Sequence, residues 1–233
     1  MNSISVWMII AILGEIGSGK SVTATKKIVT SKLPSFVNFD VRVEKQGVKR
    51  LKKEHIAKKK LIKTKKTGEE VFDYEVNWQF WNDQLKRYGN YNICLDECHN
   101  LFSSRRSTSK FNIVATQWIS QIRKILGDSE QSHIYLISQK LMRIDVAFRD
   151  LLNCVIYSEK LIDETQKIPT RCFDQGKLKI KDLPAIYIVN RYFVGSDCDI
   201  KFNEYHMTGR KTYSFKTLFL ANPYFQFYNS YEI

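Results

Sequence analysis

Short apolar runs alternate with stretches of helical periodicity along the first two thirds of the chain. The apolar runs are each short enough to be a buried strand, and they lie at 4–13, 91–95, 133–137 and 154–157. The stretches between them repeat apolar residues at a helical spacing and lie at 21–31, 77–87 and 111–126. Strands that alternate with helices in this way predict an α/β fold with a mainly parallel sheet.

The remaining segments carry weaker patterns. Residues 35–41 alternate and predict a second strand, while 61–74 predict a β-hairpin whose turn is 66–69. Residues 158–184 are polar and are expected to be irregular, with a turn at Gln175-Gly176. Further strands are expected at 185–194, 199–202 and 212–215. We therefore expect a core over 1–160, which includes an insertion at 42–74, and a β-rich C-terminal extension over 161–233 that packs on the same core.

Charge changes the interpretation of the insertion. The chain of 233 residues has a formal net charge of +13, and residues 42–66 hold twelve basic and two acidic residues, a net charge of +10. Such a segment is typical of an arm that contacts nucleic-acid phosphates. A solvated loop, or a loop that faces an acidic protein, remains an alternative.

The sequence has few features of a membrane-spanning or secreted protein. No apolar run approaches the roughly 18 residues of a membrane span, and the run at 4–13 is interpreted as a strand and not as a signal peptide. The five cysteines form no C-x-x-C pair, so we expect reduced thiols in a cytoplasmic protein. A zinc site at Cys98 and His99 would need two more ligands, and none follows at a suitable spacing.

The strongest motif follows the first apolar run. Residues 14–21 read G-E-I-G-S-G-K-S, the phosphate-loop (Walker A) pattern, between a predicted strand and a predicted helix. Its backbone amides would bind phosphate oxygens, the Lys20 ammonium would reach the β- and γ-phosphates of ATP, and the Ser21 hydroxyl would bind Mg²⁺. The residues expected to bind the nucleotide are Gly14, Gly17, Ser18, Gly19, Lys20, Ser21 and Val22.

A second motif ends the apolar run at 91–95. Asp96 and Glu97 follow that strand directly, where ligands of parallel sheets are bound. We expect Asp96 to hold Mg²⁺ and Glu97 to act as general base on the attacking water. A kinase that transfers phosphate to its own substrate has no need of that base, so the pair favours hydrolysis.

Two further sites have alternative interpretations. Gln139 ends the strand at 133–139 and is expected either to sense the γ-phosphate or to be a satisfied polar end of the strand. Trp78, Phe80 and Trp81 favour a helix that faces the core over a platform for stacking nucleic-acid bases. The late aromatic residues at 224–231 favour packing on the sheet or on a neighbouring subunit over the binding of bases.

Several runs together resemble a known family. Residues 95–105 (L-D-E-C-H-N-L-F-S-S-R), the helix end I-R-K at 122–124, I-S-Q at 137–139, I-D-V-A-F-R at 144–149 and the tyrosine-rich 222–230 are similar to zonula-occludens-toxin-like (Zot-like) ATPases of the FtsK/HerA superfamily. The resemblance implies a RecA-like P-loop NTPase core, assembly as a ring that is commonly a hexamer, and movement of DNA. It also implies an arginine that acts on the neighbouring subunit's nucleotide, at Arg123 or alternatively at Arg105 or Arg106.

The chain also departs from that family. Ser138 stands where threonine is common, the basic insertion is not a family feature, and filamentous-phage members usually carry a membrane span that is not found here. The last of these differences favours a soluble packaging motor over a membrane extrusion machine.

The sequence thus predicts a Mg²⁺-dependent ATPase that translocates DNA, for viral genome packaging or virion morphogenesis, with a capsid or membrane protein as a possible partner. We expect it in the cytoplasm, or peripherally at a capsid vertex or membrane. The alternatives are a small-molecule P-loop kinase, a DECH-type helicase (Asp96-Glu97-Cys98-His99) and an ATP-binding assembly protein without motor activity. A helicase would need a second RecA domain, for which 233 residues leave no room. Ring size, direction of movement, DNA or RNA as the substrate, and viral or plasmid origin stay open.

Overall fold

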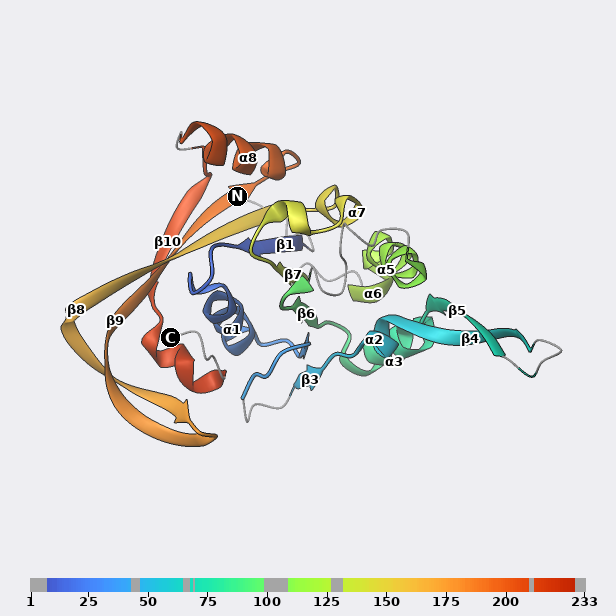
Figure 1. The fold of residues 1–233 in the computed structure, drawn as a ribbon, viewed down its shortest axis with the longest axis horizontal. Helices are drawn as coiled ribbons and strands as arrows, with labels where there is room; N and C mark the ends of the chain where they lie inside the picture. Colours follow the sequence, from blue (N-terminus) through green and yellow to red (C-terminus); the bar gives the residue numbers. More distant parts are fainter. Residues whose placement is uncertain are drawn as a thin grey trace.

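The computed structural model describes residues 8–42, 47–64, 68, 70–98, 109–126, 132–209 and 212–228. An eight-stranded sheet in the order β10-β9-β8-β1-β7-β6-β2-β3 runs through the molecule, and a separate two-stranded hairpin projects from one end (Figure 1). The expected α/β fold with a mainly parallel sheet is confirmed.

The sheet has a parallel part and an antiparallel part. Six strands run parallel to their neighbours: β1 (Met8–Leu13), β2 (Ser35–Val37), β3 (Val48–Arg50), β6 (Asn92–Leu95), β7 (His133–Ile137) and the start of β8 (Cys154–Asp174). Two strands are antiparallel to their neighbours: β9 (Lys177–Val194) and β10 (Phe215–Leu220). β7 lies between β1 and β6, and all three strands are parallel. Their carboxyl ends, each followed by candidate residues, therefore lie at the same edge of the sheet.

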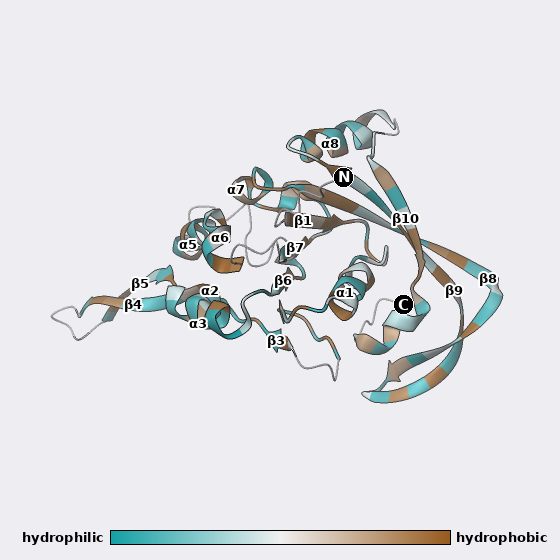
Figure 2. Ribbon diagram, turned by 180° about the vertical axis from the view of Figure 1, so that it is seen from behind, coloured by the Kyte–Doolittle hydropathy of each residue, from teal (hydrophilic) through white to brown (hydrophobic). Residues whose placement is uncertain are grey.

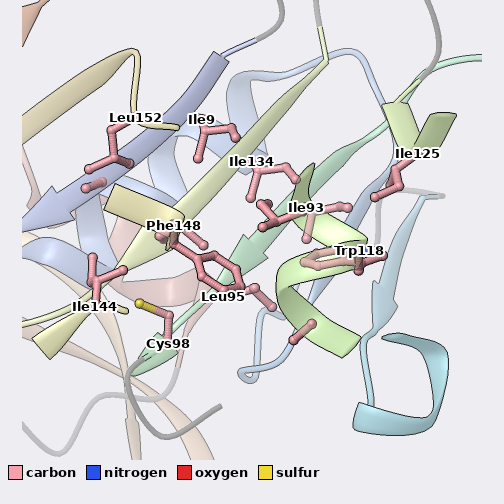
Figure 3. Packing of buried hydrophobic residues seen from close by; sticks show 14 of the residues in the cluster. Ile9, Ile93, Leu95, Cys98, Trp118, Ile125, Ile134, Ile144, Phe148 and Leu152 are labelled. Carbon is pink, nitrogen blue, oxygen red and sulfur yellow. The ribbon is translucent and has the colours of Figure 1, made fainter. Parts of the chain in front are cut away.

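Helices cover both faces of the parallel part. The alternating residues of β1 divide between two apolar clusters, with Ile9 in one and Ile10 in the other. On the face of Ile10 lies α1 (Lys20–Thr30). The opposite face is covered by α3 (Trp78–Tyr88), α5 (Lys110–Ser120), α6 (Ile122–Leu126), α7 (Val146–Arg149) and α8 (Cys198–Thr208). Figure 3 shows this second cluster, in which Trp118 and Phe148 pack over Ile93, Leu95 and Ile134.

The helix at 77–87 faces the core, as its spacing favours. Trp81 is fully buried and packs edge-on against Phe36 and nearly parallel to Tyr91. The Asn77 side chain accepts a hydrogen bond from the Phe80 amide at 3.2 Å and so caps the helix. Trp81 is therefore a core residue and not part of a stacking platform.

The basic segment is only partly an insertion. Val48–Arg50 form the edge strand β3, α2 (Lys53–Ile56) follows, and Leu51 and Ile56 are buried in the core. Only β4 (Ala57–Thr64) and β5 (Glu70–Val76) leave the body of the protein, as the hairpin that Figure 1 shows. The expected hairpin is confirmed, while its turn at 66–69 lies outside the described residues apart from Gly68.

Some expected elements differ. Residues 158–184 are not irregular, because β8 and β9 continue through them as one long hairpin that is closed at Gln175-Gly176. Both turn residues have positive φ, 49° and 79°, as a tight two-residue turn requires. The expected strand at 199–202 is wrong: these residues belong to α8, whose Phe202 packs against Phe193.

Three boundaries also move. The second strand ends at Val37 and not at residue 41, and the last strand begins at Phe215 and not at residue 212. The single helix expected at 111–126 is two helices, α5 and α6, because the backbone leaves the helical conformation at Gln121.

The C-terminal segment lies inside the curve of the β8–β9 hairpin. After β10 the chain forms the 3-10 helix η3 (Asn222–Phe227), which contacts β8, β9 and α1. A shorter 3-10 helix, η2 (Leu141–Arg143), follows β7. Figure 2 shows the distal part of the hairpin striped with hydrophilic and hydrophobic residues, whereas β1 is uniformly hydrophobic.

Candidate functional site

The phosphate loop occupies the expected place between β1 and α1. Gly19 precedes the helix with φ 91°, and a Cβ atom there would collide with the Ile188 side chain of β9. A Cβ on Gly14, whose φ is 149°, would lie 2.5 Å from the Ser158 carbonyl oxygen of β8. Both positions require glycine, because β8 and β9 press directly against the loop.

The two motifs meet through one hydrogen bond. The Ser21 hydroxyl donates to Asp96 Oδ2 at 3.1 Å, across 75 positions of the sequence. Lys20 is buried, and its Nζ donates to the Glu15 carbonyl oxygen of the loop at 2.7 Å. The structure thus brings together the phosphate loop and the acidic pair that the sequence predicted separately.

The acidic pair is held by its own backbone and by Asn38. The Asn38 side chain accepts a hydrogen bond from the Asp96 amide at 2.6 Å and donates to the Asp96 carbonyl oxygen at 2.8 Å. The Glu97 amide donates to Asp96 Oδ1 at 2.8 Å, and Glu97 has a φ of 48°, which is rare for a residue with a side chain. The turn after β6 is therefore fixed in an uncommon backbone conformation.

Burial sets the electrostatics of Asp96. Removal from water raises the pKa of the Asp96 carboxyl above its usual value, because the charged form loses solvation. The hydrogen bonds from the Glu97 amide and the Ser21 hydroxyl, and the nearby charge of Lys20, act in the opposite direction. A divalent cation at this carboxylate would supply the charge that burial leaves uncompensated.

Gln139 lies at the same edge, after the neighbouring strand β7. Its Oε1 accepts a hydrogen bond from Arg143 Nη1 at 2.7 Å, while the buried Ser138 hydroxyl donates to the Lys140 carbonyl oxygen at 3.2 Å. The Gln139 side chain is thus hydrogen-bonded at the end of the strand, and its role as a sensor stays a prediction. Arg143, which sequence reasoning did not select, is its partner.

The structure describes little of the three arginines that were expected to act between subunits. Arg105 and Arg106 lie outside the described residues, as does His99. For Arg123 the structure describes only the backbone, within α6. The role of each arginine stays a prediction.

A polar network fixes α1 to the antiparallel strands. Ser158 Oγ donates to Asn190 Oδ1 at 2.7 Å, and Thr23 Oγ1 donates to the same oxygen at 3.2 Å. All three residues are buried. This network links α1, the helix that carries Lys20 and Ser21, to β8 and β9.

A cavity borders the phosphate loop, and β8, β9 and the segment after β10 supply half of its lining residues. Its lining residues are Gly17, Gly19, Lys20, Ser21, Val22, Lys160, Ile186, Ile188, Phe225 and Tyr228. Sequence reasoning missed Ile186 and Ile188 of β9 and Lys160 of β8, because no local motif marks these positions. It expected the late aromatic residues to pack on the sheet, and the burial of Phe225 and Tyr228 against Ile186 and Ile188 confirms this.

The described helices include none that combines the length and the apolar character needed to cross a membrane.

Comparison with solved structures supports the fold. The N-terminal domain of zonular occludens toxin from Neisseria meningitidis matches with a TM-score of 0.51 and 14% identity, and the match covers 96% of this chain and 100% of that domain. The genome packaging NTPase B204 from Sulfolobus turreted icosahedral virus 2, solved with ATP-gammaS, gives a TM-score of 0.39 at 14% identity, and the match covers 67% of this chain and 75% of that one. Of these two similarities, only the first is close enough to support the fold.

Comparison with curated proteins gives no match. The family model of zonular occludens toxin (Zot), in contrast, matches residues 8–191, which include the phosphate loop, the acidic pair, β8 and most of β9. The chain therefore belongs to the Zot family.

Proposed function

We propose that this protein is a Mg²⁺-dependent ATPase that translocates DNA during viral genome packaging or virion morphogenesis. The observation that carries the proposal is the hydrogen bond between Ser21 of the phosphate loop and Asp96 of the acidic pair. That contact puts the start of α1 beside the Asp96 carboxylate, the arrangement in which a phosphate loop and an acidic residue can share a metal ion during phosphoryl transfer from ATP.

The phosphate loop suits a triphosphate. The helix start at Lys20 directs amide groups and the positive end of the helix dipole towards the loop. Ser18 Oγ is buried and has no hydrogen-bond partner among the described residues, so a phosphate oxygen would satisfy it. Lys20 would exchange the Glu15 carbonyl for phosphate oxygens of the nucleotide.

The donor set at Ser21 and Asp96 fits Mg²⁺. The ion prefers oxygen ligands, and the hydroxyl and the carboxylate are already within 3.1 Å of each other. When bound, the metal would neutralise charge on the phosphates of ATP. Ser21 and Asp96 would hold it, directly or through water.

Glu97 is the proposed general base. Its backbone is fixed by the amide bond to Asp96 and by a positive φ, so its side chain starts from a defined position beside the metal ligand. Gln139, at the end of the adjacent strand, would contact the γ-phosphate or the attacking water. This assignment favours hydrolysis over transfer to a second substrate.

The β4–β5 hairpin is the proposed DNA contact, although its lysines are not equivalent. Glu75 accepts ion pairs from Lys58 at 3.2 Å and from Lys60 at 3.3 Å. Lys59 and Lys63 take part in no ion pair that the structure shows among the described residues of the hairpin. We therefore assign the phosphate contacts first to Lys59 and Lys63.

We further propose that ATP is bound between the subunits of a ring, which in this superfamily is commonly a hexamer, with an arginine of one subunit acting on the nucleotide of the next. Arg123 is the first choice. An arginine supplied in this way contributes about 10³ to 10⁵ in rate. The setting would be the cytoplasm, a capsid vertex or the surface of a membrane.

The experiment measures ATP hydrolysis by the purified protein with and without double-stranded DNA, over a series of salt concentrations. We expect DNA to stimulate hydrolysis, and we expect the stimulation to fade with salt because phosphate contacts release counterions. Glu97→Gln, which keeps the size and polarity of the side chain, should abolish hydrolysis while ATP still binds. Hydrolysis that is indifferent to DNA at every salt concentration would refute the DNA motor.

A further inference from the structure

The cavity beside the phosphate loop is lined by two chemically different groups of residues. One group consists of the loop glycines with Lys20 and Ser21, which suit phosphate groups. The other group consists of Ile186 and Ile188 of β9 together with Phe225 and Tyr228, and these four residues form one apolar cluster with Val22 of α1. A nucleotide has the same two-part chemistry, with a charged phosphate chain and a flat, largely apolar base.

We propose that Ile188, Phe225 and Tyr228 form the wall against which the base of the bound nucleotide packs. This inference rests on the proposed function, since it extends the site that the phosphate loop begins. Aromatic rings and branched aliphatic side chains bind nucleobases by stacking and by apolar contact, without a need for hydrogen bonds. The wall would be built by β9 and the C-terminal segment and not by the core motifs.

The positions of the lining residues along the chain support a base that lies against β9 and η3. Val22 follows Lys20 and Ser21 on α1 and is itself packed in the apolar cluster, so the cluster begins where the phosphate-binding residues end. Ile188 lies against Gly19, closely enough that no side chain fits at that position. A nucleotide held at Lys20 therefore reaches β9 and η3 within its own length.

The wall is fastened at both ends. Asn222 begins η3 and is fully used: its Oδ1 accepts from the Ile186 amide at 2.7 Å, and its Nδ2 donates to the Pro184 carbonyl oxygen at 3.0 Å and to Thr170 Oγ1 at 3.2 Å. At the far end, Tyr228 pairs with Val41 as an isolated bridge, and the Arg42 amide donates to the Phe227 carbonyl oxygen at 2.6 Å. The aromatic residues are thus held beside the loop before any ligand arrives.

The lining also predicts low base selectivity. Apart from the residues of the phosphate loop, its polar side-chain groups are the Lys160 ammonium and the Tyr228 hydroxyl. An apolar site discriminates weakly between similar ligands, whereas a site with several hydrogen bonds to one ligand discriminates strongly. We expect ATP and GTP to bind with affinities within about tenfold of each other.

The test compares binding of Mg²⁺ complexes of ATPγS, GTPγS and inorganic tripolyphosphate by calorimetry, so it needs no hydrolysis. Tripolyphosphate presents the phosphates without a base. The wild-type protein should bind ATPγS about tenfold or more tightly than tripolyphosphate. Phe225→Leu and Tyr228→Leu keep apolar bulk but remove the flat ring, and each should weaken ATPγS binding about five- to a hundredfold while leaving tripolyphosphate binding unchanged.

Two controls separate the causes. Phe219→Leu removes an aromatic ring from the edge of the same cluster, under Lys26 and outside the cavity lining, and should bind all three ligands like the wild type. Lys20→Ala should weaken all three together. Thermal melting of each variant shows whether it is folded, and an unfolded Phe225 variant leaves the decision to Tyr228→Leu and to the wild-type comparison.

Equal affinity of the wild type for ATPγS and tripolyphosphate would overturn the base wall and leave the ATPase proposal intact. The same holds if the ring variants weaken both ligands equally. Binding of all three ligands as expected without any hydrolysis would instead overturn the ATPase proposal and support the wall. If none of the three ligands binds, both proposals fail.

Discussion

At the scale of single residues, Asp96 is placed for chemistry at a cost to stability. Burial raises the pKa of its carboxyl, so the folded protein holds this proton more tightly than the unfolded chain does. The favourable contribution to folding is present below the unfolded pKa of Asp, about 3.9, and it is lost as the pH rises through the folded pKa. At a pH above the unfolded pKa, the burial of metal-free Asp96 therefore lowers the free energy of unfolding.

This predicts that Asp96→Asn raises the melting temperature of the nucleotide-free protein at pH 7. Asparagine keeps an acceptor for the Glu97 amide and offers a partner to the Ser21 hydroxyl, while it removes the buried charge. The difference from the wild type should grow as the pH rises from about 4, and it should shrink or reverse when Mg²⁺ and ATPγS are added. Scanning calorimetry across pH measures this. A variant that melts below the wild type at every pH would contradict it.

At this scale the sequence locates the candidate site where its residues are adjacent in the chain, and the structure brings Ser21 and Asp96 together. Lys20, Ser21, Asp96 and Glu97 follow from local motifs whose spacing is set by the phosphates and the metal. Asn38, which holds the Asp96 turn from 58 positions away, has no such signal. Its role depends on which strands become neighbours, and this is decided only by the assembled sheet.

At the scale of elements, the β4–β5 hairpin neutralises part of its own charge. Lys58 and Lys60 hold the pKa of the Glu75 carboxyl below its usual range by their hydrogen bonds to it. Because these residues are exposed, such pairs contribute little to stability, but they do occupy two lysines. Glu75 therefore limits how much positive charge the hairpin presents to DNA.

We predict that Glu75→Gln strengthens DNA binding, because it releases Lys58 and Lys60 without changing the size of the side chain. The slope of log affinity against log salt should steepen by up to about 0.9 for each additional DNA phosphate that the released lysines neutralise. Fluorescence anisotropy with labelled duplex DNA measures this. The double variant Lys59→Gln with Lys63→Gln should lower both the affinity and the slope. If neither change moves the slope, the hairpin is not the DNA contact.

The elements that sequence patterns missed are those whose burial is incomplete. Beyond Lys160 most side chains of β8 are exposed or only half buried, so no apolar alternation marks the strand, and it is backbone pairing with β9 that keeps it extended. In 199–202 a window of four residues cannot distinguish a strand from the first turn of α8, in which Phe202 is the buried residue. The buried strands β1, β6 and β7, in contrast, follow from their continuous apolar runs.

At the scale of the whole molecule, the proposed ring predicts complementation between two inactive variants. Glu97→Gln lacks the base but keeps Arg123, whereas Arg123→Ala lacks the arginine but keeps the base. If the arginine acts between subunits, a mixture of the two inactive proteins should recover hydrolysis at interfaces that combine both intact groups. Hydrolysis is measured against the mixing ratio, with Lys124→Ala, the neighbouring cation, in place of Arg123→Ala as a control. A mixture that hydrolyses ATP no faster than the two variants do separately would exclude Arg123 from this role.

The strand order also has a consequence for how the protein is made. β1 leaves the ribosome well before its two neighbours, which pair with it through His133 and Cys154, more than a hundred residues later. Contacts this distant in the chain form slowly, and an unpaired apolar strand is prone to aggregate. Until those later residues are made, the nascent chain therefore displays the strand that will become the centre of the sheet. Chaperone supply and translation speed should thus govern the yield of the protein more than the final stability of its fold.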